Sequence, residues 1–315
     1  MAKGPRHILP NRVYEISTRT FQEQLLLTPS PWLNKLIHGV IGRALKRYEV
    51  QLFWYVFMCN HNHMMLAARR PSELVAFIAY VNSNVASEVN RLLGRRGAFW
   101  GAPYEPLLLS EEPGIQERRL AYLIGQGCKE GLVSSPRELP GASPLNAVLK
   151  AARIVGTWVD WTSMYQAARR KLGARPQREY QQEYEVTLSS LPAWQDLDEE
   201  QQRERIAKIV TDIEEQTAEE NAALGREPAG AAKIIAGDPY SRPRHSKRGR
   251  SPRFLWLSIA ARNAMRDAYR CFAAAYREAS QAYRAGNLTA EFPPWSFPPP
   301  LPMTCGPPTP QTASG

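Results

Sequence analysis

The chain has 315 residues, of which 43% are hydrophobic and 22% are charged, which excludes disorder throughout and allows two domains. Its 40 Lys and Arg against 30 Asp and Glu give a net charge of +10, which favours a polyanionic partner such as nucleic acid. The four cysteines form no CxxC pair, and the sequence shows neither a secretory h-region nor a long apolar run. We therefore expect a cytoplasmic protein with no membrane segment.

Strand and helix patterns alternate over the first 130 residues. Period-two apolar patterning marks the strands, and the first helix opens on Ser30 as N-cap with Pro31 at its first position. The β-α-β-β-α-β order predicts an α+β fold, a ferredoxin-like antiparallel sheet with helices on one face, followed by an α-helical C-terminal extension. The predicted elements are residues 12–17, 31–48, 52–67 (a strand pair), 72–93, 104–109 and 110–129.

The remainder of the chain divides by composition. Residues 151–236 hold 11 basic and 15 acidic side chains and show no obvious strand, whereas residues 237–315 hold 11 basic and 4 acidic ones. A Pro, Gly and Ser-rich basic stretch separates these parts, and prolines crowd the C-terminal end. We predict an N-terminal domain over 1–140, a helical acidic extension over 141–236, a basic linker over 237–253, a basic amphipathic helix over 254–291 and a Pro-rich tail over 292–315.

Two short motifs carry candidate chemistry. His61 and His63 are two residues apart on a predicted strand, so their side chains share one face, as in a metal site; separate hydrogen bonds are an equally good interpretation of this pair alone. Tyr122 and Gln126 are four residues apart on a predicted helix and also share a face. A tyrosine in such a position is more often part of the core.

Together, the two motifs resemble those of single-tyrosine HUH transposases, in particular the REP-associated tyrosine transposases. The strand of that family, Met-Pro-Asn-His-hydrophobic-His, stands here as Met58-Cys-Asn-His61-Asn62-His63. Its helix, Tyr-Ile-x-x-Asn-Pro-Val-x-x-Gly-Leu-Val, stands as Tyr122-Leu-Ile-Gly-Gln126-Gly-Cys-Lys-Glu-Gly131-Leu-Val133. Residues 14–19 are similar to the family's first strand, and residues 95–100 are similar to its approach to the last strand. The resemblance covers roughly residues 5–140.

The resemblance implies a catalytic N-terminal domain, DNA nicking and strand transfer. By position, His61, His63 and Gln126 would hold Mg²⁺ or Mn²⁺, and Tyr122 would attack single-stranded or hairpin DNA, associated with repeats, to leave a 5′-phosphotyrosine and a free 3′-hydroxyl. The family works in pairs, so a homodimer is expected. Tyr80 and Tyr104 are rival nucleophiles that rank below Tyr122.

Several basic or aromatic residues are candidate DNA contacts. In the predicted C-terminal helix, arginines occupy one arc and aromatic residues the neighbouring arc, as in a helix that docks its aromatics and solvates its arginines. Such arginines can also contact phosphates. The candidates are Arg19, Arg95, Arg96, Tyr104, Arg248, Arg250, Arg262, Arg266 and Arg270.

Two alternatives stay open. Asn62 is polar where the family has an apolar residue between the histidines, and a buried amide costs roughly 1–3 kcal/mol unless it is hydrogen-bonded. A non-catalytic, structure-specific DNA-binding protein with the same fold is therefore the first alternative. A metal-dependent RNA-processing or HNH-like nuclease is the second.

Overall fold

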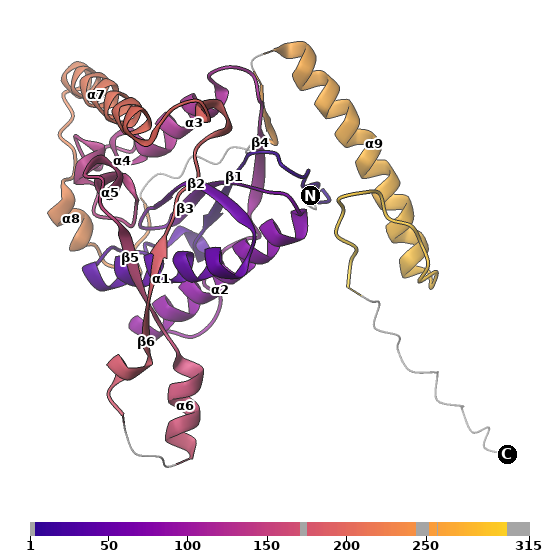
Figure 1. Cartoon of the computed structure of the whole chain (residues 1–315), viewed down its shortest axis with the longest axis horizontal. Helices are drawn as coiled ribbons and strands as arrows, with labels where there is room; N and C mark the ends of the chain where they lie inside the picture. The colour runs from indigo at the N-terminus through magenta and orange to yellow at the C-terminus, as the bar shows by residue number, and fades with distance from the viewer. Residues whose placement is uncertain (1–3, 171–174, 244–251, 257, 301–315) are drawn as a thin grey trace. The chain divides into compact units, whose positions relative to one another are not determined.

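The computed structural model describes residues 4–170, 175–243, 252–256 and 258–300 (Figure 1). They fall into two compact units: Pro10–Ser258 makes one, and Met1–Leu9 with Ile259–Gly315 makes the other. The strands are β1 (Tyr14–Arg19), β2 (Val50–Phe57), β3 (His61–Ala68), β4 (Glu105–Leu109), β5 (Ile154–Val159), β6 (Gln181–Val186) and β7 (Phe254–Leu255). The helices are α1 (Pro31–Arg47), α2 (Pro71–Leu92), α3 (Ile115–Ile124), α4 (Gln126–Lys129), α5 (Leu145–Leu149), α6 (Trp161–Arg169), α7 (Glu199–Leu224), α8 (Ala231–Ile235) and α9 (Ile259–Arg284).

The main sheet has the strand order β2-β3-β1-β4-β7. Its first four strands pair antiparallel, in the ferredoxin-like order that the sequence predicts, so the α+β fold class is confirmed. The fifth strand, β7, pairs parallel with β4 and makes the sheet mixed. The sequence analysis missed β7, which consists of only two residues at the start of the segment predicted as a helix.

Helices cover both faces of this sheet (Figure 1), whereas the sequence predicts helices on one face only. Figure 1 shows α1 and α2 on one side and α3 and α7 on the other. On the second side, Met65 and Ala67 of β3 pack in one buried cluster with Leu123 of α3 and Val210 of α7. All eight residues of β3 are buried. Because side chains alternate between the two faces along a strand, His61 and His63 share the face of Met65 and Ala67, beneath α3.

Local signals at the helix ends set the bounds of α1 and α7. The Ser30 side chain accepts a hydrogen bond from the backbone N–H of Leu33 and starts α1. Asp198 and Gln201 form a capping box at the start of α7, and Gly225 ends that helix in the left-handed region at φ 56°.

The helix expected over 110–129 is interrupted. It begins at Ile115, after Gly114, and α3 ends at Ile124, where Gly125 separates it from the four-residue α4. Tyr122 and Gln126 therefore lie on two consecutive short helices. Glycine inside a helix costs about 1 kcal/mol relative to alanine, which gives a physical reason for the break at Gly125.

The segment expected to be helical over 141–236 contains a second sheet, which corrects the prediction that it has no strand. β5 and β6 form an antiparallel pair that packs on α1. The packing is close because glycines face each other: a Cβ on Gly156 would lie 1.9 Å from the Gly39 nitrogen, and one on Gly39 would lie 2.2 Å from the Thr157 carbonyl carbon. This contact joins residues far apart in sequence, which period counting does not detect.

The second unit is built around α9. Its aromatic side contacts both ends of the chain: the Tyr269 hydroxyl donates to the Pro5 carbonyl at 2.8 Å, and the His7 ring stacks on Phe272 at 3.9 Å. The Tyr276 hydroxyl donates to the Phe297 carbonyl at 2.9 Å. The sequence predicts that this helix starts at Phe254, but it starts at Ile259, because Phe254 belongs to β7.

Candidate functional site

His61 and His63 open β3 and lie side by side on the face covered by α3 and α4. Their ring centroids are 5.0 Å apart, and their exposed fractions are 2% and 7%. Burial, His63 and the nearby Arg19 together lower the pKa of His61 well below the ordinary value of 6.5. The His61 imidazole is thus neutral at pH 7 and can offer a nitrogen lone pair.

Both imidazoles are oriented through their Nδ1 atoms. His63 Nδ1 lies 2.7 Å from Oε1 of Glu15, and His61 Nδ1 lies 2.7 Å from Oδ1 of Asn60. A carboxylate and an amide oxygen only accept hydrogen bonds, so each Nδ1 carries the proton and each Nε2 keeps its lone pair. Metal-binding histidines are held in the same way by their outer partners.

Gln126, the first residue of α4, reaches the same place. Its Nε2 lies 3.3 Å from His63 Nε2, and its side chain is 4% exposed. Two buried atoms here, His61 Nε2 and Gln126 Oε1, have no hydrogen-bond partner among the described residues. Because an unpaired buried polar atom costs about 1–3 kcal/mol, a ligand that binds both atoms would stabilise this cluster.

A divalent ion fits that requirement. Imidazole nitrogens bind divalent transition ions, and amide and phosphate oxygens suit Mg²⁺ and Mn²⁺. No three His, Cys, Asp or Glu side chains gather in a metal-binding group within the described ranges, and the Gln126 amide lies beside His63. Glu130 lies nearby, with its Oε1 3.8 Å from His61 Nε2 and its side chain 42% exposed.

Tyr122 lies next to the histidines, with its ring centroid 6.5 Å from that of His63. Two cations flank this ring: the Arg119 guanidinium carbon at 3.9 Å and the Lys129 ammonium at 4.1 Å from its centre. The tyrosine is half-buried, so its ring is held from two sides while part of it stays accessible.

Arg119 connects the tyrosine to the histidine pair. Its guanidinium makes a bidentate ion pair with Glu15, with Nη2 2.9 Å from Oε1, and that carboxylate also accepts from His63. Burial acts to raise the pKa of Glu15, but the hydrogen bonds from His63 and Arg119 outweigh it, so the pKa is lowered and the carboxyl is ionised.

The sequence analysis missed Glu15 and Arg119. A signal for Glu15 exists: alternation in β1 places this charged residue in line with Ser17 and Arg19, on the face that meets the histidines in the paired strand. Arg119 precedes Tyr122 by one helical turn. Neither signal is specific without knowledge of which strands pair.

The predicted DNA contacts are scattered. Arg19, the last residue of β1, is exposed and pairs in register with His61, so its charge lies at the site. Arg96 is exposed, whereas Arg95 is tied into its own loop by hydrogen bonds to Asn90 and Ala98. Tyr104 is only 8% exposed, which leaves little of its surface for DNA.

The other predicted DNA contacts are far from the histidines in the sequence. Arg248 and Arg250 lie outside the described residues. Arg262 is partly buried on α9, and Arg266 and Arg270 are exposed there, in the second compact unit.

Asn62 is directed away from the metal-type cluster. It is fully buried, and neither atom of its side-chain amide has a hydrogen-bond partner in the part of the chain that the structure describes. Because it lies between His61 and His63 on a strand, it points to the opposite face of the sheet. Its polarity therefore changes the packing beneath the sheet and leaves the donor set intact.

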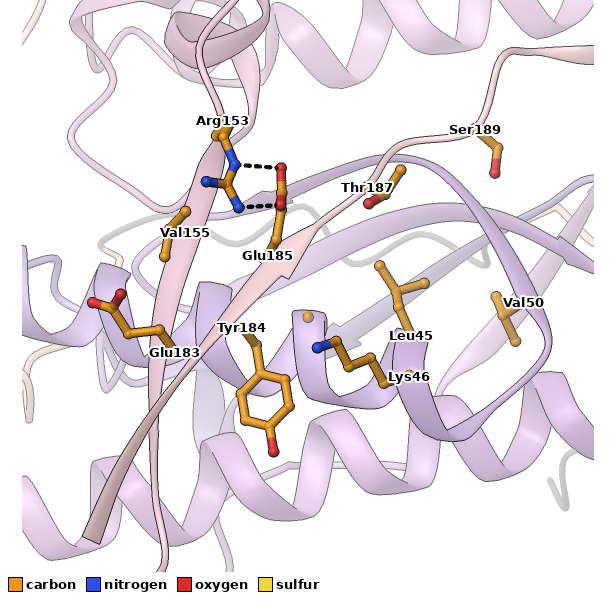
Figure 2. A pocket seen from close by; sticks show the side chains of 11 residues that line it. Leu45, Lys46, Val50, Arg153, Val155, Glu183, Tyr184, Glu185, Thr187 and Ser189 are labelled. Atoms are coloured by element: carbon orange, nitrogen blue, oxygen red, sulfur yellow. Dashed lines mark hydrogen bonds and ion pairs between the residues drawn. The ribbon is translucent and has the colours of Figure 1, made fainter. Parts of the chain in front are cut away.

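A cavity of about 510 Å³ lies elsewhere, between α1 and the β5–β6 pair (Figure 2). Two of its charged side chains form an ion pair, because Arg153 binds Glu185 through two hydrogen bonds. The Lys46 ammonium lies 5.2 Å from the centre of the Tyr184 ring. None of its lining residues belongs to the histidine and tyrosine cluster.

The solved structures that resemble this chain include two transposases. A REP-associated tyrosine transposase bound to a REP hairpin aligns over 61% of this chain and 96% of its own, at 10% identity and a TM-score of 0.38. A putative transposase from Deinococcus radiodurans R1 aligns over 38% of this chain and 95% of its own, at 17% identity and a TM-score of 0.28. Both are transposases by description. At these scores, the function has to be inferred from the side chains of the site.

No family model and no curated protein matches the chain. Across the described ranges, no helix combines the length and the apolar character needed to cross a membrane.

Proposed function

We propose that the protein nicks and rejoins single-stranded or hairpin DNA, with Tyr122 as the nucleophile and a divalent ion held by His61, His63 and Gln126. The observation that carries this proposal is the pair of buried, unpartnered atoms, His61 Nε2 and Gln126 Oε1, beside His63 and a tyrosine flanked by two cations.

The proposed chemistry is a direct transfer. The Tyr122 oxygen attacks the phosphorus of a phosphodiester, a new O–P bond forms, and the bond from phosphorus to the 3′-oxygen breaks. The phenol gives up its proton to solvent and the departing 3′-oxygen takes one up, so the products are a 5′-phosphotyrosine and a free 3′-hydroxyl. The energy of the phosphodiester is kept in the covalent link, and the reverse attack by another 3′-hydroxyl rejoins the strand without ATP.

The surrounding residues supply charge and orientation. Arg119 and Lys129 place positive charge beside the tyrosine, where negative charge develops on the phosphate in the transition state. A bound Mg²⁺ or Mn²⁺ would polarise the scissile phosphate. Arg19 adds a solvent-exposed cation next to His61 for a neighbouring phosphate.

The proposed chemistry requires two chains to act together. Each chain carries one such tyrosine, whereas moving a DNA segment requires two strand ends to be processed. We therefore propose two chains per reaction, which sedimentation of the protein with and without DNA tests.

A non-catalytic, structure-specific DNA-binding protein is the second candidate. Asn62 favours it, because its buried amide, with no partner among the described residues, lowers the stability of the strand that carries both histidines, although it points away from them. The two candidates differ in one respect only, the covalent step.

The experiment that tests the proposal is incubation with hairpin-bearing single-stranded DNA and Mn²⁺. DNA labelled at each end in turn should give a free 3′-hydroxyl fragment and a 5′ end linked to protein after denaturation. DNA that is bound but never cut would support the non-catalytic candidate. A free 5′-phosphate would instead indicate hydrolysis by a nuclease.

A further inference from the structure

The β5–β6 pair carries a projection that the proposed cleavage site does not use. We define the arm as the described residues between Asp160 and Tyr180, namely 160–170 and 175–180, which follow β5, include α6 and lead into β6. Figure 1 shows α6 at the far ends of β5 and β6, beyond α1 and α2. No residue of α6 is buried, although its nine residues include Trp161, Met164 and Tyr165.

The base of the arm is fixed. The Trp161 indole donates to Glu88 of α2 at 2.7 Å, and the Arg91 guanidinium carbon lies 3.7 Å from the centre of a Trp161 ring. Trp158, at the end of β5, is covered in the same way by Arg43 of α1 at 3.5 Å. The arm is thus anchored to both helices beneath the sheet, so α6 has a defined position in this unit.

The far part of the arm presents cations and one aromatic ring to solvent. Tyr165 is 64% exposed, and the Arg169 guanidinium carbon lies 6.0 Å from its ring centre. Arg170 and Arg178 are exposed, and neither forms an ion pair within the described ranges. Arg175 lies 3.8 Å from Glu179, which is the weakest pairing in the arm.

This combination differs from the other charged surface of the same strands. In the cavity of Figure 2, Arg153 is neutralised by Glu185. Glu183, which also lines this cavity, lies 3.4 Å from Lys35 of α1. On the arm, Arg169, Arg170 and Arg178 form no ion pair with a described residue, and the Tyr165 ring is exposed. Phosphates attract such cations, and an exposed aromatic ring stacks on an unpaired base, so the surface is complementary to single-stranded nucleic acid.

We propose that this arm is a second DNA-binding element, on which Tyr165 stacks with a base while Arg169, Arg170 and Arg178 contact phosphates of single-stranded DNA outside the cleavage site. The proposal depends on the proposed function only in taking DNA as the ligand. It assigns no chemistry to the arm and predicts an effect on affinity without an effect on the covalent step.

The test uses the full-length protein and a fluorescent single-stranded oligonucleotide that carries a hairpin. The double variant Arg170→Glu with Arg178→Glu should weaken binding at least tenfold and make the dependence of log affinity on log salt shallower by about 1.4, at about 0.7 per lost contact. The matched control is Lys208→Glu with Lys233→Glu, two exposed lysines of α7 and α8, which makes the same change in net charge. The control should bind within twofold of the unchanged protein.

Tyr165 provides an independent variant at an exposed position. Tyr165→Ala should weaken binding about tenfold, and Tyr165→Phe should restore it, because the ring stacks and the hydroxyl is dispensable. At saturating DNA, all arm variants should form the Tyr122 adduct at the unchanged rate.

Equal weakening in the arm variant and the lysine control would overturn the proposal, because it would mean that net charge alone matters. Unchanged binding by both the double variant and Tyr165→Ala would also overturn it. A protein that forms no adduct, yet loses DNA affinity specifically through the arm variants, would remove the cleavage proposal and leave the arm assignment standing.

Discussion

His63 Nδ1 and Glu15 Oε1 lie 2.7 Å apart, and the same carboxylate pairs with Arg119, whose guanidinium covers the Tyr122 ring. One buried carboxylate thus orients a proposed metal ligand and holds the cation beside the proposed nucleophile. The contact connects β1, β3 and α3, so the geometry of the site depends on the correct pairing of the sheet.

Glu15→Gln keeps the shape of the side chain and removes the charge that holds His63 and Arg119. We expect Mn²⁺ affinity, measured by calorimetry without DNA, to fall about 10- to 100-fold, as for other outer partners of metal-binding histidines. Glu111→Gln is the matched control, because Glu111 also pairs with an arginine, Arg12, at 2.9 Å but at the surface. Equal Mn²⁺ affinity in the two variants would contradict the role given to Glu15.

Gly156→Ala tests the close contact of the second sheet with α1. A Cβ at this position would lie 1.9 Å from the Gly39 nitrogen, so the strand has to move away from the helix. Overpacking of this kind costs about 1–3 kcal/mol of the free energy of unfolding, measured by denaturant titration. Gly237→Ala, whose Cβ would meet its nearest atom at 3.1 Å, should cost less, and a reversed order would be incompatible with the packing described.

The lowered pKa of the buried His38 leads us to expect a loss of stability in mild acid. Burial lowers its pKa from 6.5 to about 4, and its Nδ1 lies 2.7 Å from the Tyr55 hydroxyl. As pH falls from about 6.5 to about 4, the unfolded chain takes up a proton at this residue and the folded chain does not, so the free energy of unfolding falls with pH. The loss amounts to at most about 3 kcal/mol.

His38→Gln is the variant that isolates this contribution, since other groups also titrate in the same range. The free energy of unfolding of the variant should change less between pH 6.5 and pH 4 than that of the unchanged chain. Identical pH dependence of the two proteins would show that His38 is protonated in both states or in neither.

Substitution of the α9 arginines tests whether the second unit contacts DNA. Replacing Arg262, Arg266 and Arg270 with Gln should weaken binding to all DNA sequences and make the slope of log affinity against log salt shallower, by about 0.7 per lost phosphate contact on single strands. The triple variant Lys150→Gln, Lys208→Gln and Lys233→Gln removes the same charge from exposed positions elsewhere and should leave the slope unchanged. An unchanged slope in the α9 variant would limit this helix to a structural role.

Local signals in the sequence were sufficient for the central fold. The N-cap at Ser30 and the apolar alternation of the strands each act over a few residues, and the elements that they predict are present. The spacing of His61 and His63 likewise fixes their common face, because strand geometry alone requires it.

The features that the sequence analysis missed depend on contacts between distant residues. β5 and β6 pack on α1 through Gly39 and Gly156, which are far apart in the chain. β7 is too short to leave a periodic pattern, and its place is set by pairing with β4. Glu15 becomes part of the site only when β1 pairs with β3 and Arg119 is brought over it.

The central claim is that Tyr122 attacks DNA, and mass spectrometry of the covalent adduct tests it most directly. After reaction of the full-length protein with hairpin-bearing single-stranded DNA and Mn²⁺, the nucleotide should be found on the peptide that contains Tyr122. Tyr122→Phe should form no adduct while binding DNA almost unchanged, because it removes one oxygen and neither charge nor much packing. Tyr104→Phe should form the adduct as the unchanged protein does. An adduct on Tyr104, or an undiminished adduct in Tyr122→Phe, would contradict the account.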